Sequence, residues 1–159
     1  MGRGKINNSS NIAVLEELHA AIDERLIKGY EMFDKYLNIS VPEELKYFAV
    51  DAISRSYDKK HLLNLASASQ CFFWFRYLHS DVFHNMHSEK HKADEFIERA
   101  TLLGDYFFSQ FSLYLIPIDS TPLIDEFSIF LNEESSKLME VSKDKFTAFF
   151  ERVSEVLDD

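Results

Sequence analysis

The sequence predicts an all-α protein: a single helical-bundle domain over residues 11–159, preceded by a disordered tail over residues 1–10. The length of 159 residues corresponds to one domain, large enough to bury a core without disulfides or a structural metal. Only 4 glycines and 3 prolines are present, which favours long helices over turn-rich β-structure. Apolar residues make up 46% of the chain, and they recur near helical spacing.

Two helices are expected in the N-terminal third of the chain. Residues 1–10 are polar and rich in Gly, Asn and Ser, whereas apolar residues recur at helical spacing from residue 11 to about residue 37. Residues 40–43 read Ser-Val-Pro-Glu, which fits a capping box in which the serine and glutamate side chains each bind the other residue's amide. A second helix is therefore expected from this box to about Tyr57.

Four further helices are expected in the rest of the chain. One runs from about His61 through Met86, and the next from about His91 to Ile116, where Pro117 stops it. Thr121 and Pro122 restart the chain as a helix, because proline suits the first turn. Ser142 is a candidate cap for the last helix, so the prediction is about six helices in all.

Two of these helices carry unusually many aromatic residues. Residues 71–78 (CFFWFRYL) point bulky side chains in nearly every direction, which predicts a buried central helix. Residues 102–115 are almost as apolar. Because the chain also holds 15 phenylalanines, we expect part of this apolar surface to be buried against another subunit as well as in the core.

The charge balance excludes several classes of function. The formal net charge is −10, so binding to nucleic acid or to anionic lipid headgroups is not expected. A single cysteine, Cys71, excludes an intramolecular disulfide and a cysteine zinc cluster, and its aromatic surroundings predict an inert core thiol. No run approaches the roughly 20 apolar residues of a membrane span, and the N-terminus lacks a signal-peptide core. A soluble cytoplasmic protein without a transmembrane segment is expected.

Two segments carry a resemblance to a known family. Residues 78–85 (LHSDVFHN) are similar to the first aspartate-rich motif of trans-prenyl diphosphate synthases, which usually runs Leu-His-Asp-Asp-Val-x-Asp. About twenty residues on, residues 100–109 (ATLLGDYFFS) resemble the helix that follows that motif in the family, which reads Ala-x-Leu-x-Gly-Asp-Tyr-Leu-x-Ala. The order and the separation of the two segments match the family, and the resemblance covers about residues 65–115.

The departures from the family pattern concern its metal site. The family holds Mg²⁺ with carboxylates, and the first and last aspartates of its motif share one helix face at i, i+4. Here Ser80 and His84 occupy those two positions, and Asp81 is the surviving acid, about 100° around a continuous helix from Ser80. Residues 42–47 stand where the family binds isopentenyl diphosphate through a Gly-Gly-Lys segment. The second aspartate-rich motif has no counterpart, since Asp158-Asp159 cannot replace it.

This pattern resembles the small, non-catalytic subunit (component A or I) of heterodimeric bacterial medium-chain prenyl diphosphate synthases. The resemblance implies a truncated isoprenoid synthase fold and a catalytic large subunit as partner, in the synthesis of menaquinone side chains. The chain alone would be inactive and would hold no cofactor, whereas the partner would hold Mg²⁺ and bind most of the allylic and isopentenyl diphosphates. The short length favours hexaprenyl over heptaprenyl diphosphate as the product.

Such a subunit would order the partner's active site, wall part of the apolar tunnel for the growing chain, and help to set the product length. The candidate residues for docking or tunnel lining belong to the two aromatic helices, and the sequence leaves open which of them lie in the core. They are Phe72, Phe75, Phe107, Phe108, Phe111, Tyr114 and Leu115.

Other interpretations remain open from the sequence. His84, His87 and His91 have the i, i+3 and i, i+4 spacing of helical metal ligands. A metal-dependent hydrolase with an adjacent His-Asp pair is a further possibility, although Ser80 separates His79 from Asp81. A third alternative is a helical adaptor or sensor that binds its partner through an aromatic helix face and has no role in prenyl transfer.

Overall fold

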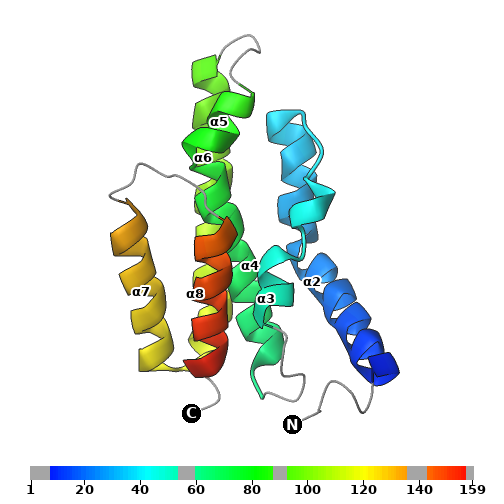
Figure 1. The fold of residues 1–159 in the computed structure, drawn as a ribbon. Helices are drawn as coiled ribbons and strands as arrows, with labels where there is room; N and C mark the ends of the chain where they lie inside the picture. Colours follow the sequence, from blue (N-terminus) through cyan, green and yellow to red (C-terminus); the bar gives the residue numbers. More distant parts are fainter. Residues whose placement is uncertain (1–7, 54–59, 88–92, 136–142, 157–159) are drawn as a thin grey trace.

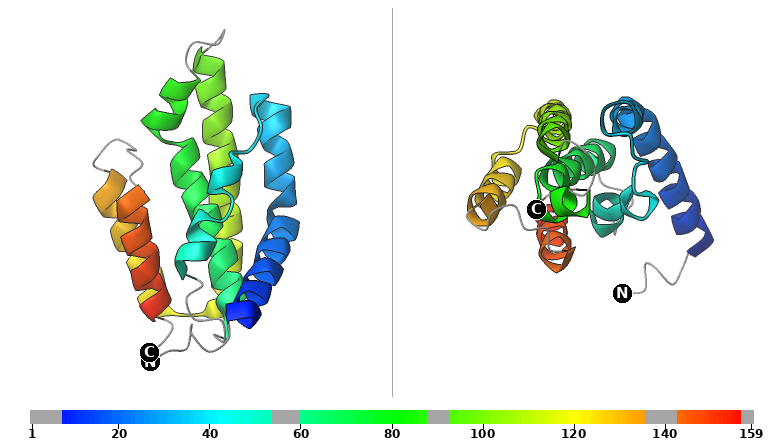
Figure 2. Two further views of the ribbon diagram at one scale, coloured as in Figure 1. Left: turned by 45° about the vertical axis from the view of Figure 1, so that its right-hand side comes forward. Right: turned by 90° about the horizontal axis from the view of Figure 1, so that it is seen from above.

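Helices α4 (Leu62–Leu78) and α6 (Ala93–Leu115) lie side by side at the centre of the molecule. In the computed structural model, the described residues are 8–53, 60–87, 93–135 and 143–156, and they form seven α-helices and no strand. Helix α2 lies on one side of the central pair, and α7 and α8 lie on the other (Figures 1 and 2). The remaining elements are α2 (Asn8–Leu37), η1 (Glu43–Leu45), α3 (Phe48–Ile53), α5 (Asp81–Met86), η2 (Ile116–Ile118), α7 (Thr121–Ser135) and α8 (Lys143–Val156).

The all-α prediction is confirmed, but the predicted start of the second helix at the capping box is wrong. The chain forms the short 3₁₀ turn η1 and then α3 (Phe48–Ile53), and the predicted end near Tyr57 lies outside the described residues. Ser40 is exposed and makes no capping bond, because extended Pro42 precedes the turn. The buried Gln70 side chain of α4 binds both sides of this turn, since its Nε2 donates to Leu45 O (2.9 Å) and its Oε1 accepts from Ala49 N (3.0 Å). Tertiary packing therefore overrides the local capping signal.

The predicted continuous helix over residues 61–86 is also wrong. Helix α4 ends at Leu78 and α5 begins at Asp81, which is why seven helices appear where about six were expected. Ser80 causes the break, because its hydroxyl donates to Tyr77 O (2.6 Å) and accepts from Phe83 N (3.1 Å). Such local side-chain bonds compete with the helical backbone pattern and cap the next helix.

The other predicted boundaries agree with the structure to within a few residues. Helix α2 begins at Asn8, three residues before its expected start, and α6 ends one residue before the expected Ile116. The cap of α7 is Ser120, whose hydroxyl accepts from Leu123 N (3.3 Å), so the predicted start at Thr121 is correct to one residue. Ser142, the candidate cap of α8, lies outside the described residues. None of the described helices is long and apolar enough to cross a membrane.

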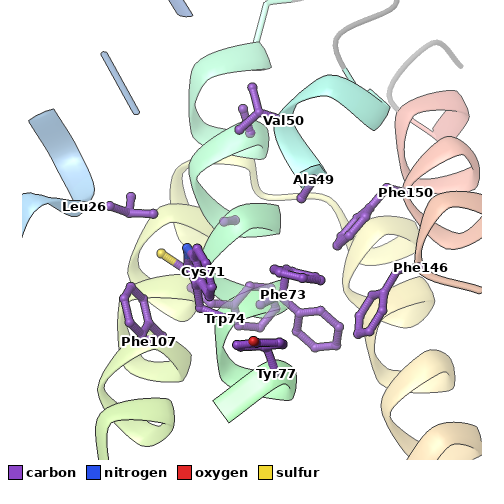
Figure 3. Close-up of a cluster of buried hydrophobic side chains, with 14 of the residues drawn as sticks. Leu26, Ala49, Val50, Cys71, Phe73, Trp74, Tyr77, Phe107, Phe146 and Phe150 are labelled. Atoms are coloured by element: carbon purple, nitrogen blue, oxygen red, sulfur yellow. The ribbon is translucent and has the colours of Figure 1, made fainter. Parts of the chain in front are cut away.

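The core is built around α4, as predicted from the bulky side chains that point in nearly every direction from residues 71–78 of this helix. Figure 3 shows Phe73, Trp74 and Tyr77 of α4 meeting Phe107 of α6 and Phe146 of α8. Twelve of the 15 phenylalanines are buried in this chain, and none of the other three is fully exposed. The inference that so many phenylalanines need a second subunit to bury them is therefore wrong. The fold buries them itself, because rings from α2, α7 and α8 pack edge to face against rings of α4.

A glycine allows α2 to approach α6 closely. A Cβ atom at Gly29 would lie only 2.4 Å from the Phe107 ring, so the ring occupies the space that any side chain would need. Phe107 is fully buried there, and its ring also meets Phe33 and Trp74. The glycine therefore sets the distance between these two helices. Cys71 is buried in the same region, and burial raises the pKa of its thiol, in agreement with an inert core thiol.

Candidate functional site

The two segments that resemble prenyl diphosphate synthases meet in space. His79 directly follows α4, and its Nε2 lies 3.0 Å from Thr101 O and 3.1 Å from Asp105 Oδ1 on α6. Because a carbonyl oxygen only accepts, the Nε2 atom carries a proton. The His79 side chain therefore joins the end of α4 to the middle of α6.

Gly104 makes this junction possible. A Cβ atom at this position would lie 2.4 Å from His79 Cδ2 and 3.3 Å from the backbone oxygen of Phe75. The imidazole ring thus packs directly on the α6 backbone beside Asp105, whose side chain is 59% exposed. We call His79, Thr101, Gly104 and Asp105 the motif junction.

Ser80 and His84, at the two positions where the family has metal-binding aspartates, make structural hydrogen bonds in this chain. Ser80 is fully buried and caps α5, as described above. His84 is buried, and its Nε2 lies 2.8 Å from Leu78 O, so that nitrogen donates to the end of α4. Asp81 is exposed in the first turn of α5. These residues do not fit a Mg²⁺ site, because the hydroxyl and the imidazole already bind backbone groups and only one carboxylate remains.

The described histidines of the predicted metal-ligand spacing, His84 and His87, do not point toward a common site. The His87 ring packs on Phe83 (centroid distance 4.9 Å) and Phe96 (5.2 Å), while His84 points back to α4. His91 lies outside the described residues. Across the described ranges, no three His, Cys, Asp or Glu side chains are grouped so that they could hold a metal ion.

Four of the predicted contact residues belong to the buried core of this chain, namely Phe72, Phe107, Phe111 and Leu115. Phe107 is fully enclosed, as described above, and Phe72 is 1% exposed with its ring against Phe111, Phe127 and Phe149. Phe72 nevertheless forms the floor of an open groove. This groove has a volume of about 400 Å³ and lies between the end of α6, η2 and α7. We call it the α7 groove, and its lining residues are Phe72, Phe108, Phe111, Ser112, Leu115, Ile116, Asp119, Ile124, Phe127, Ser128 and Leu131.

Four of these lining residues are among the contact residues predicted from the sequence, namely Phe72, Phe108, Phe111 and Leu115. The wall that α7 provides was missed, although the apolar residues of α7 recur at helical spacing and carried the signal. The prediction that the named residues contact a partner or a prenyl chain stays a prediction.

Phe75 and Tyr114 lie away from the groove. The half-buried ring of Phe75 packs against Phe108 (centroid distance 4.6 Å) and His79 (4.8 Å), so it supports the motif junction. The Tyr114 ring lies 5.1 Å from the Arg25 guanidinium, and its hydroxyl donates to Arg25 O (3.4 Å). Burial raises the pKa of Tyr114, so this hydroxyl keeps its proton and joins α6 to α2.

An exposed apolar face along α6 was also missed. Leu102 and Leu113 are 60% and 58% exposed, and half-buried Tyr106 lies between them on the same side of the helix. Tyr36 of α2, 53% exposed, continues this surface across a cavity of about 290 Å³ that Leu102 and Tyr106 also line. We call Tyr36, Leu102, Tyr106 and Leu113 the α6 face. Its spacing of four and seven residues on α6 was visible in the sequence.

A separate group of polar side chains joins α2 to the η1–α3 segment. The Tyr47 hydroxyl donates to Asp23 Oδ2 (2.6 Å), and His19 Nε2 lies 2.7 Å from Asp51 Oδ1. The rings of His19 and Tyr47 are stacked at 3.8 Å. Burial, and then the bond to Asp23, raise the pKa of Tyr47 to about 12, so its hydroxyl acts as a donor. This group was not predicted from the sequence.

Comparison with known proteins identified no relative of this chain. No protein-family model, no curated protein sequence and no solved structure matches the chain.

Proposed function

We propose that this chain is the non-catalytic subunit of a heterodimeric prenyl diphosphate synthase, and that it activates an aspartate-rich large subunit. Within that class, synthesis of hexaprenyl diphosphate for menaquinone side chains is favoured over heptaprenyl. The observation that carries the proposal is the motif junction. Its residues come from the two segments that resemble the family: His79 of the first lies within hydrogen-bond distance of Thr101 O and of Asp105 Oδ1 of the second, and its ring packs on Gly104.

The use of Ser80 and His84 supports a non-catalytic role. Ionisation of an allylic diphosphate needs metal and cationic stabilisation of the leaving group. Both side chains are buried and bind backbone carbonyl groups instead. In this chain the two positions thus have a structural role, while the chemistry would belong to the partner, which would hold Mg²⁺ and the diphosphates.

The α6 face supports docking to a partner subunit. Leu102 and Leu113 are large apolar side chains that the fold of this chain leaves in contact with water. Aromatic and apolar side chains such as Tyr36 and Tyr106 are typical of the buried centre of an interface. The face follows α6, the helix that carries the second family segment, so docking there would couple the partner directly to the motif junction.

The experiment combines this chain with the aspartate-rich prenyl diphosphate synthase subunit of the same genome. Each protein alone and an equimolar mixture receive farnesyl diphosphate, isopentenyl diphosphate and Mg²⁺, and the chain lengths of the products are measured. We expect no product from this chain alone and long-chain product from the mixture. Activity from this chain alone would overturn the proposal.

The alternative of a helical adaptor without a role in prenyl transfer is favoured by one observation, because the α6 face would serve any protein partner. The same experiment separates the two functions. If the two proteins do not associate in size-exclusion chromatography, or if they associate and the products stay unchanged, the adaptor interpretation gains and the synthase proposal fails.

A further inference from the structure

The α7 groove has the size and lining of a small-molecule site. Its volume of about 400 Å³ falls within the range of roughly 300–1,000 Å³ that is typical of ligand pockets. Phe108, Phe111 and Leu115 form the α6 side, Ile124 and Phe127 belong to the α7 side, and the floor is a further phenyl ring. Such a lining favours a hydrocarbon group over a polar one, because burying unpaired polar atoms is costly.

Few polar groups border the groove, and one of them is already satisfied. The Ser112 hydroxyl donates to Phe108 O (3.2 Å), one helical turn back. Ser128 and Asp119 are exposed. Asp119 is the only charged residue of the lining, and it lies in the two-residue connection between η2 and α7. A ligand whose hydrocarbon part fills the groove would thus meet a carboxylate near its polar end.

We infer that the α7 groove binds a linear hydrocarbon chain whose polar end is uncharged or cationic, and not anionic. The apolar walls account for the hydrocarbon chain, and the small volume limits the ligand to one chain. Asp119 repels an anionic end, and the net charge of −10 acts in the same direction. This inference does not rest on the proposed function, because neither the motif junction nor the α6 face takes part in it.

The test uses three probes with the same decyl chain: decanol, decyltrimethylammonium and decyl sulfate. Each is titrated into the full chain below its micelle concentration, and binding is followed by NMR chemical shifts and by calorimetry. We expect decanol and decyltrimethylammonium to bind, and decyl sulfate to bind about fivefold or more weakly than the ammonium probe. Nuclear Overhauser contacts should join the decyl chain to the rings of Phe108 and Phe127.

Two isoleucines of α7 provide a matched pair of variants. Ile124 lines the groove and Ile129 does not, yet their side chains are similarly exposed at 46% and 49%. Ile124→Trp should fill the groove and weaken decanol binding at least tenfold, whereas Ile129→Trp should leave it unchanged. Equal effects of the two substitutions would overturn the inference, as would the absence of contacts between the probe and the two phenyl rings.

A third variant isolates the contribution of Asp119. This residue has a positive φ of 51°, a conformation that asparagine tolerates well, so Asp119→Asn removes the charge without backbone strain. We expect the preference for the ammonium over the sulfate probe to shrink several-fold, while decanol binds as before. An unchanged preference would mean that the overall charge alone selects the head group, and it would overturn the assignment to this carboxylate. Tighter binding of decyl sulfate than of decanol would overturn the inference as a whole.

Discussion

Gly104 and His79 form the contact on which the motif junction depends. A methyl group at Gly104 would overlap the imidazole ring, which Thr101 and Asp105 hold in place. Alanine improves helix propensity by about 1 kcal/mol over glycine, but overpacking costs about 1–3 kcal/mol. We therefore expect Gly104→Ala to lower the free energy of unfolding by up to about 2 kcal/mol, measured by denaturant titration.

The control for this prediction is the same substitution without the ring. In a His79→Ala background the overlap is gone and the gain in helix propensity remains, so Gly104→Ala should raise the free energy of unfolding by up to about 1 kcal/mol. The sign of the effect should thus reverse between the two backgrounds. Destabilisation of the same size in both would contradict a direct contact between these residues.

Ser80 and His84 test whether the family's metal site can be restored. In Ser80→Asp with His84→Asp, each new carboxylate would be buried beside a backbone carbonyl that now receives a hydrogen bond. Losing these donors and burying the charges should cost about 3 kcal/mol or more, so the melting temperature should fall sharply and no prenyl transfer should appear. The exposed Asp81→Asn serves as the control, with a change within about 0.5 kcal/mol. A stable, active double variant would refute this account of the turn.

At the level of single residues, the sequence showed which residues depart from the family pattern, but it did not predict the structural surroundings of those residues. It named Ser80 and His84 as the departures from the family, but it placed them on one continuous helix. Serine is compatible with a helix interior by propensity, so its role as a cap only appears once Tyr77 O and Phe83 N are seen to bind it. The close packing of His79 on Gly104 needs two helices in contact, which no local pattern specifies.

Helix α6 is the element that we expect to meet the partner subunit. Leu113→Glu places a charge on the α6 face without disturbing the core, because the side chain is 58% exposed. It should weaken the heterodimer at least about tenfold, or about 1.4 kcal/mol, while the melting temperature of the free chain changes little. Affinity is measured by titration of the labelled large subunit.

The matched control for that substitution lies on α7. Ile129→Glu also introduces a charge at an exposed apolar position, with 49% exposure, but it is not part of the α6 face. It should leave the affinity for the partner unchanged. If Ile129→Glu weakened the complex as much as Leu113→Glu, docking along α6 would be wrong.

Helical spacing predicted the long elements and failed where tertiary contacts dominate. The extent of α2 and α6 follows from their apolar periodicity, whereas η1 exists because Gln70 binds the turn from inside the core. In the α7 groove, the sequence supplied Phe108 and Phe111 but not Ile124. From the sequence alone, an apolar residue on an amphipathic helix is assigned to the buried core, and only the structure shows whether its side chain is exposed.

For the whole molecule, composition indicated the fold class but misled about where the phenylalanines are buried. Fifteen phenylalanines suggested that this chain needs a partner to bury them, yet twelve are buried around α4. The surface that we propose for a partner is the α6 face, whose leucines and tyrosines come from α6 and α2. The net charge of −10 also opposes binding of free diphosphates to this chain, so they would reach the complex through the large subunit.

The most direct test of this division of labour is a calorimetric titration of the isolated chain with pyrophosphate in the presence of Mg²⁺. We expect no saturable binding of pyrophosphate at millimolar concentrations, because Ser80 and His84 bind backbone carbonyls and Asp81 has no second carboxylate beside it on the turn. Magnesium-dependent binding of pyrophosphate that Asp81→Asn abolishes would contradict it.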